Sequence, residues 1–362
     1  MMYLDDLLKR NVLFCSYGRS AIYLALLAID VKNKDVIVPT LTCNTNILSA
    51  IKYAGGNTIF VDIKKNLDID EHDLIKKLSN DVAVVIIHCY FGGIPSNLQR
   101  LSKILASKNI KVLLDVAHSW GYDLHDLADV TIYSFSKSFI NPGGGACEFK
   151  EIGLFEKAKK IQYDSRKCAH SMVVNAEVFH YMKMLAQDRH MMTNISYNPV
   201  YSIFRVFSKL LRCLHIYSKQ DFYETLSKIN YGIYDTRITF QQLRTIKDNL
   251  KHQDILYSKR SIIASKLKKY IAPYIENSTW MTYTLLVDEI ETVQDFFKQI
   301  DVKTRRVWPA HQKYSNNQLT SNVIYIRDHL LLLDIDNVTE YQIQRMEDFK
   351  INVLSNRRKR DY

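Results

Sequence analysis

The sequence predicts an α/β fold: a mainly parallel central sheet sandwiched by helices, followed by a smaller C-terminal α+β domain. Three observations support it. Over the first 150 residues, short apolar runs alternate with stretches of helical pattern, which is typical of parallel sheets covered on both faces. After about residue 245 the pattern changes to a mixture of helices and strands. A chain of 362 residues is also too long for one simple core. We therefore expect a large domain over 1–245 and a small one over 246–362.

The apolar runs are long enough for strands and carry few polar residues, so we expect both of their faces to be buried. The helical stretches between them have one apolar face, and Gly55 and Gly56 end one of them. The expected strands are 35–40, 58–63, 82–90, 111–117, 129–136 and 145–150, and the expected helices are 20–29, 44–55, 71–79 and 98–109.

The second half is less regular. Residues 155–230 read as a divergent insertion in the large domain that is helical, aromatic and basic. A long helix is expected over 238–271. Beyond it the expected strands are 280–287, 302–309 and 322–333, and the expected helices lie near 292–300 and 339–354.

Composition limits the possible classes of function. The net charge of +11 would suit an anionic partner, but no zinc-finger, helix-turn-helix or RNA-binding signature accompanies it, so we expect no nucleic acid. The six cysteines are spread singly, which favours free thiols in a reducing cytoplasm over disulfides or a metal site. No secretory signal or transmembrane run is expected. The basic amphipathic stretch 199–218 could touch a membrane surface, although most such stretches cover a core or a dimer partner.

Three candidate groups lie where ligands bind in such sheets, at the carboxyl ends of the strands or at a helix start. Asp115 ends an apolar strand, where an acid must be paired; it could equally be a helix cap or half of a buried salt bridge. Gly18, Arg19 and Ser20 open a helix whose amides could hold a phosphate, or Ser20 could simply cap it. Lys137 precedes three consecutive glycines and could be a solvated charge or a reactive amine.

Taken together, these groups match the three needs of pyridoxal phosphate. A carboxylate can hold the pyridine nitrogen protonated, a helix start can seat the phosphate, and a lysine can condense with the aldehyde. The glycines after Lys137 would let the backbone turn tightly behind it.

The order of motifs then resembles a known family. GRSAIYLALLAI is followed by DVIVPTLTCNTNILSAIKYAGGNTIFVDI, VIIHCYFG, DVAHSWG and SFSK with GGGA, and later by YDTRITFQQLRTI and KTRRVWPAH. This series is similar to the DegT/DnrJ/EryC1/StrS sugar aminotransferases, which are fold-type I enzymes that use pyridoxal 5'-phosphate and form homodimers with shared active sites. The resemblance is specific over residues 12–150 and thin over 155–230.

The resemblance implies a role for individual residues. Lys137 would be the Schiff-base lysine and the proton shuttle, and Asp115 the partner of the pyridine nitrogen. The remaining cofactor contacts would be Gly18, Arg19, Ser20, Cys43, His118, Ser134 and Asp235, and the substrate contacts Tyr90, Arg305 and Trp308. Arg306 also lies at the expected mouth of the site, where Arg305 and Arg306 could bind a nucleotide-sugar diphosphate or equally belong to a solvated edge strand.

Several positions depart from the family pattern. Cys43 stands where an aromatic residue usually stacks on the pyridine, and His118 where a glutamine is common. Lys137 lies three residues after Ser134 instead of five, so an alignment on the serine would place Phe139 at the lysine position. Asp235 replaces an asparagine that reaches the partner's phosphate, and we expect Arg19 to compensate for its negative charge.

The function implied is amination of a nucleotide-linked keto-deoxysugar, with glutamate or glutamine as donor, for surface polysaccharide, O-antigen or glycoconjugate synthesis. Two rivals remain. One is a sugar dehydratase that uses the cofactor without a Schiff-base lysine. The other is a degenerate, cofactor-free member that acts as a binding or scaffold subunit and could bind a membrane through 199–218.

Overall fold

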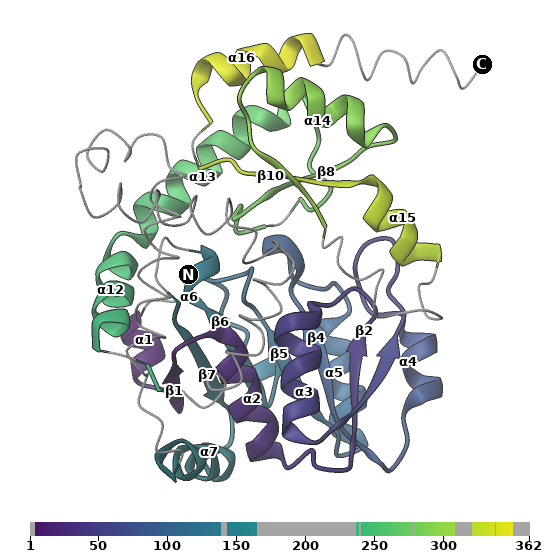
Figure 1. The fold of residues 1–362 in the computed structure, drawn as a ribbon, viewed down its shortest axis with the longest axis vertical. Coiled ribbons are helices and arrows are strands. Elements are labelled where there is room, and N and C mark those ends of the chain that lie inside the picture. The colour runs from purple at the N-terminus through teal and green to yellow at the C-terminus, as the bar shows by residue number, and fades with distance from the viewer. Residues whose placement is uncertain are drawn as a thin grey trace, which may run out of the picture.

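The larger sheet has seven strands in the order β1-β7-β6-β5-β4-β2-β3 and lies in the lower half of Figure 1. The computed structural model describes residues 4–138, 143–164, 237–238, 240–276, 278–307, 321–336 and 338–349. The strands are β1 Val12–Cys15, β2 Asp35–Pro39, β3 Asn57–Val61, β4 Val82–His88, β5 Lys111–Asp115, β6 Val130–Ser134 and β7 Gly145–Phe149. Strands β3, β2, β4, β5 and β6 pair in parallel, and β7 pairs antiparallel with both β6 and β1. The expected mainly parallel sheet is confirmed.

Helices cover both faces of this sheet because its strands are apolar on both sides. They are α1 Leu4–Leu8, α2 Gly18–Ile29, α3 Ser49–Ala54, α4 Glu71–Lys77, α5 Leu98–Ser107, α6 Phe135–Ser138 and α7 Ile152–Asp164. A π-helical turn, Asn44–Leu48, precedes α3, and short 3₁₀ turns span Tyr90–Gly92 and His125–Leu127.

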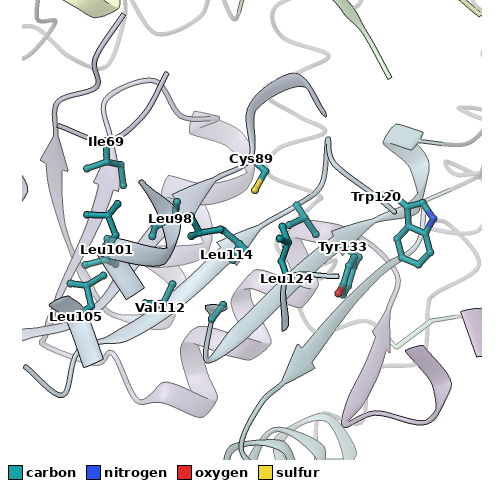
Figure 2. Packing of buried hydrophobic residues seen from close by; sticks show 14 of the residues in the cluster. Ile69, Cys89, Leu98, Leu101, Leu105, Val112, Leu114, Trp120, Leu124 and Tyr133 are labelled. Atoms are coloured by element: carbon teal, nitrogen blue, oxygen red, sulfur yellow. The ribbon is translucent and has the colours of Figure 1, made fainter. Parts of the chain in front are cut away.

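Side chains along each strand alternate between two cores. In β4, Val84 and Ile86 pack in the core that also contains residues of α2, α3 and α7. Val85 and Ile87 pack in the opposite core with α4 and α5. Figure 2 shows part of this second core, including the α5 leucines beside strand β5. Burial on both faces fixes the register, since a shift by one residue would exchange the two sets.

The C-terminal part builds a three-stranded antiparallel sheet in the order β8-β10-β9, in the upper half of Figure 1. Its elements are α12 Phe240–Lys251, α13 Gln253–Lys268, β8 Tyr283–Leu286, α14 Ile290–Gln299, β9 Thr304–Arg306, α15 Ser321–His329, β10 Leu330–Leu333 and α16 Glu340–Phe349. The boundary at residue 245 stays a prediction: Ile246 and Leu250 of α12 pack in the core of the larger sheet.

The two sheets meet in a shared apolar cluster at the carboxyl ends of β2 and β4. Leu41 and Tyr90 of the larger sheet pack there with Val307, Ile326 and Leu332. This junction places β9 of the smaller sheet beside the edge at which the candidate site was expected.

Two expected elements differ from the structure. The helix expected over 238–271 is interrupted at His252, whose backbone (φ −106°, ψ 11°) separates α12 from α13. The expected strand 322–333 is a helix, α15, followed by strand β10. The buried residues Val323 and Ile326 are three apart, which is a helical spacing, and only the four consecutive leucines form a strand.

The basic stretch 199–218 and most of 155–230 lie outside the described residues. No helix within the described ranges is long and apolar enough to cross a membrane.

Gly145 lies where the chain passes very close to itself. A methyl group at this position would lie 2.5 Å from the Tyr17 carbonyl oxygen and would overlap the Gly18 amide nitrogen. Tyr17 also forms a β-bridge with Gly144, whose amide donates to the carbonyl of Ser16. Gly143 and Gly144 have positive φ values of 84° and 90°, which favour glycine.

Gly145→Ala is therefore expected to destabilise the protein by about 1–3 kcal/mol, because backbone atoms must move to admit the methyl group. Gly153→Ala is the matched control: a methyl there meets no atom within 4 Å, and Gly153 is exposed in α7. Urea unfolding of both variants measures the difference. Equal stability of the two variants would contradict the close packing at Gly145.

Candidate functional site

The carboxyl ends of β2, β4 and β5 bring three polar side chains together. Asp115 ends β5 and accepts a hydrogen bond at Oδ2 from His88 Nδ1, at the end of β4, over 3.1 Å. His88 Nε2 lies 2.8 Å from the hydroxyl of Thr42, just after β2. The second oxygen of Asp115 accepts from the amide of Ala117 over 3.0 Å. Asp115 is thus held by partners at both oxygens.

The environment of Asp115 keeps it ionised. Burial acts to raise the pKa of this carboxyl, but the hydrogen bonds from His88 and Ala117 outweigh burial, so the pKa is lowered. An anionic carboxylate at the end of a buried strand is able to hold a cationic heterocycle.

The start of α2 lies beside the end of β6. A Cβ added to Gly18 would lie 3.0 Å from the Cβ of Ser134 and 3.3 Å from its hydroxyl, so glycine is what lets Ser134 come this close. The residue before α2, Tyr17, is extended, and its side chain gives the helix no capping hydrogen bond. The guanidinium of Arg19 lies 4.6 Å from the centre of the Tyr17 ring. Ser20 is buried. A helix start with a glycine, a hydroxyl and a guanidinium suits a phosphate.

Lys137 belongs to α6, directly after β6. Its side chain is accessible to solvent, yet enough protein surrounds it for desolvation to be the main cause of a lowered pKa. Arg305 and Arg19 lower this pKa further, whereas Cys43 and Asp115 act to raise it. Lys137 is therefore reachable by a ligand and more readily deprotonated than a surface lysine.

His118 follows Asp115 in the same loop. Its ring stacks on Phe91, with centroids 5.7 Å apart and planes 17° apart. Phe91 has a left-handed backbone (φ 51°), which is rare for an aromatic residue and is found mainly where the surrounding structure imposes it. Burial, followed by the charge of Lys137, lowers the pKa of His118 to about 3. The ring is therefore neutral at physiological pH.

Two further expected residues lie in the walls of the site. Cys43 is partly buried, accepts a hydrogen bond from the Asn46 amide over 3.2 Å and is near enough to Lys137 to influence its pKa. Tyr90 is buried, and its hydroxyl donates to the carbonyl of Leu41. The geometry gives Tyr90 a supporting position, and its contact with substrate stays a prediction.

Arg305 and Arg306 are neighbours on β9 but face different surroundings. Arg306 forms an ion pair with Glu291 of α14. Arg305 lies 3.3 Å from the hydroxyl of Thr282, and its charge lowers the pKa of both Lys137 and His118. Among the described residues no carboxylate forms an ion pair with Arg305. The expected residues Asp235 and Trp308 lie outside the described residues.

No role was predicted from the sequence for His88, Thr42 or Phe91. His88 does end an apolar strand, and that position was its only signal. Thr42 is two residues beyond a predicted strand, and nothing in the sequence links it to His88. The unusual backbone of Phe91 has no sequence signal.

The low pKa of His118 predicts a dependence of stability on pH. In the unfolded chain a histidine titrates near 6.5, so below that pH the unfolded state binds a proton that the folded state does not. Stability supported by neutral His118 is complete above pH 6.5 and is lost as the pH falls from there towards 3. When the pH is lowered from 7 to 5, the free energy of unfolding of the cofactor-free wild-type protein should fall by about 2 kcal/mol more than that of His118→Gln. Chemical denaturation at both pH values measures this, and equal losses would contradict a neutral ring at His118.

Comparison with known proteins agrees with this arrangement. The sequence profile of the DegT/DnrJ/EryC1/StrS aminotransferase family matches residues 5–192. GDP-perosamine synthase of Escherichia coli O157:H7 is 30% identical over 152 residues, which are 39% of this chain and 41% of that protein. The 3-oxo-glucose-6-phosphate:glutamate aminotransferase of Bacillus subtilis is 27% identical over 46% of this chain and 35% of its own length. Each match thus spans well under half of the relative.

The fold also agrees with a solved structure. The structure of NtdA from Bacillus subtilis with bound PMP superposes with a TM-score of 0.65 at 17% identity, covering 95% of this chain and 73% of that one. Because the family profile matches more than half of the chain and the sheet has the same fold, this protein belongs to the DegT/DnrJ/EryC1/StrS aminotransferase family.

Proposed function

We propose that this protein is an aminotransferase that uses pyridoxal phosphate to aminate a nucleotide-linked keto-deoxysugar. The observation that carries the proposal is the convergence of a partly buried, hydrogen-bonded carboxylate, a helix start suited to phosphate and a lysine with a lowered pKa at one edge of the sheet. Each of the three comes from a different strand connection, as a site at the carboxyl edge requires.

The described residues fit the cofactor. Asp115 would hold the ring nitrogen, and Gly18, Arg19 and Ser134 would hold the phosphate. Lys137 would bind the aldehyde. Once bound, pyridoxal phosphate supplies an electron sink that stabilises negative charge on the substrate carbon.

The residues of the chain supply the remaining chemistry. Because its pKa is lowered, Lys137 can take a proton from the substrate carbon and return it without needing strongly alkaline conditions. The neutral ring of His118 can exchange a hydrogen bond with a polar atom beside it without adding charge. The position of Lys137 also favours an aminotransferase over the dehydratase alternative, because that alternative has no Schiff-base lysine.

The proposal that the substrate is anionic rests on Arg305. It is exposed beside Lys137, and among the described residues it forms no ion pair, so its guanidinium is available for a ligand carboxylate or phosphate. Two of the curated relatives carry a phosphorylated sugar in their names, and one of them names glutamate as donor. We propose the same classes here: a phosphate-bearing keto-sugar and glutamate or glutamine.

The wider setting follows from this chemistry. An amino sugar attached to a nucleotide serves as a building block for surface polysaccharide, O-antigen or other glycoconjugates. We place the protein in the cytoplasm, as a homodimer with shared active sites.

The lysine assignment is tested by spectroscopy. The purified protein with pyridoxal phosphate should absorb at about 410–430 nm, as the protonated imine of this cofactor with a lysine does. Borohydride should then fix the cofactor to the peptide containing Lys137, as identified by mass spectrometry. Lys137→Ala should lose the fixation, whereas Lys157→Ala, on the exposed face of α7, should keep it. Bound cofactor that borohydride fails to fix would support a dehydratase, and no bound cofactor would support the scaffold alternative.

The role of Arg305 is tested by a matched pair on β9. Arg305→Gln should raise the KM of one anionic reactant by about 10- to 100-fold, the scale of a lost charged hydrogen bond. Arg306→Gln should leave the KM values near wild type, because Arg306 already pairs with Glu291. Steady-state kinetics with the amino donor and the sugar varied separately show which reactant Arg305 binds. Similar effects of both variants would contradict the assignment.

A further inference from the structure

Thr42, His88 and Asp115 form a hydrogen-bonded chain beneath the candidate site. They follow β2, β4 and β5, which are neighbours in the sheet, so the chain runs across three strands. Thr42 is fully buried, and His88 is 6% exposed. Only Asp115 lies close enough to the site for its carboxylate to meet a ligand.

The partners decide where the proton of His88 lies. Asp115 is ionised and can only accept, so Nδ1 must carry a proton. Within the described part of the chain, His88 is the only partner of the Thr42 hydroxyl. If Nε2 also carried a proton, the hydroxyl would accept it and its own proton would be buried without an acceptor. The arrangement that satisfies every group has Thr42 donating to a bare Nε2.

We infer that Thr42 is a positioning residue that keeps His88 neutral and oriented so that Asp115 retains its full negative charge towards the ligand. A doubly protonated His88 would neutralise the carboxylate, and Asp115 would then hold a protonated ring nitrogen less strongly. The inference that Thr42 thereby supports cofactor binding rests on the proposed function. The protonation state of His88 does not depend on the proposed function.

The other titratable groups near this chain add no second anion that would favour a charged His88. Tyr90, whose ring packs edge-on against His88 at 5.4 Å, has a raised pKa from burial and is neutral. The buried thiol of Cys89 likewise has a raised pKa, first from burial and then from Asp115. His118 is neutral, and the charges of Lys137 and Arg305 lie close enough to lower its pKa. Asp115 is thus the one anion within this described group.

The first test needs no cofactor. In ¹⁵N-histidine-labelled protein at pH 7, long-range ¹H–¹⁵N correlation should show His88 protonated at Nδ1 and bare at Nε2. His88→Gln identifies its signal by removing it. A proton on Nε2, alone or together with Nδ1, would overturn the inference.

The second test asks whether Thr42 acts through Asp115. Thr42→Val removes the hydroxyl at nearly constant volume and should weaken pyridoxal phosphate binding about tenfold, the scale of one buried hydrogen bond. Thr42→Ser keeps the hydroxyl and should bind pyridoxal phosphate as tightly as the wild-type protein. In an Asp115→Asn background, Thr42→Val should not weaken pyridoxal phosphate binding further, because the carboxylate through which Thr42 acts is already absent.

Fluorescence titration gives the Kd of each protein, and thermal unfolding checks that each is folded. An equal loss in both backgrounds would show a merely structural role and overturn the inference. If wild-type protein bound no cofactor, the proposed function would fail, whereas the NMR result would still decide the state of His88. If Thr42→Val did not fold, Thr42→Ser and the NMR result would still test the proposal.

Discussion

The backbone of residues 143–145 passes so close to residues 16–18 that a side chain at position 145 does not fit. This contact ties the start of α2 to β7, and β7 pairs with β6 so that Gly145 lies opposite Ser134. The helix start, the Ser134 hydroxyl and Lys137 therefore hold fixed positions relative to one another. The carboxylate of Asp115 is positioned separately, because its strand β5 pairs with β4 on one edge and with β6 on the other.

Charge in the site is arranged in layers. The deepest layer, Thr42 and His88, is polar but neutral. Above it lies a single carboxylate, Asp115, and above that the cationic groups Lys137, Arg19 and Arg305. A zwitterionic cofactor with a cationic ring nitrogen and an anionic phosphate matches this order. Because Lys137 and Arg305 are exposed whereas the Asp115 side chain is only 13% exposed, these two cations are also the groups that an incoming anion meets first.

Much of the larger sheet could be predicted because its strands are uninterrupted apolar runs and its helices have clear faces. The positions of Asp115 and Lys137 followed from the rule that ligands meet the carboxyl ends of strands. The pairing of His88 with Thr42 could not be predicted, because it depends on which strands are neighbours and not on sequence spacing. The smaller sheet was harder. In 322–333 a helix passes directly into a strand without glycine or proline to mark the change, and the interruption at His252 lacks such a marker as well.

The location of Arg305 has a consequence for how such a protein can change during evolution. The groups proposed to hold the cofactor follow strands of the larger sheet, which are packed between two apolar cores, whereas Arg305 lies on β9, an edge strand of the smaller sheet. Substitutions on an edge strand disturb few neighbours. Selectivity for a reactant can therefore diverge among descendants of this chain while the carboxylate, the lysine and the helix start are inherited unchanged.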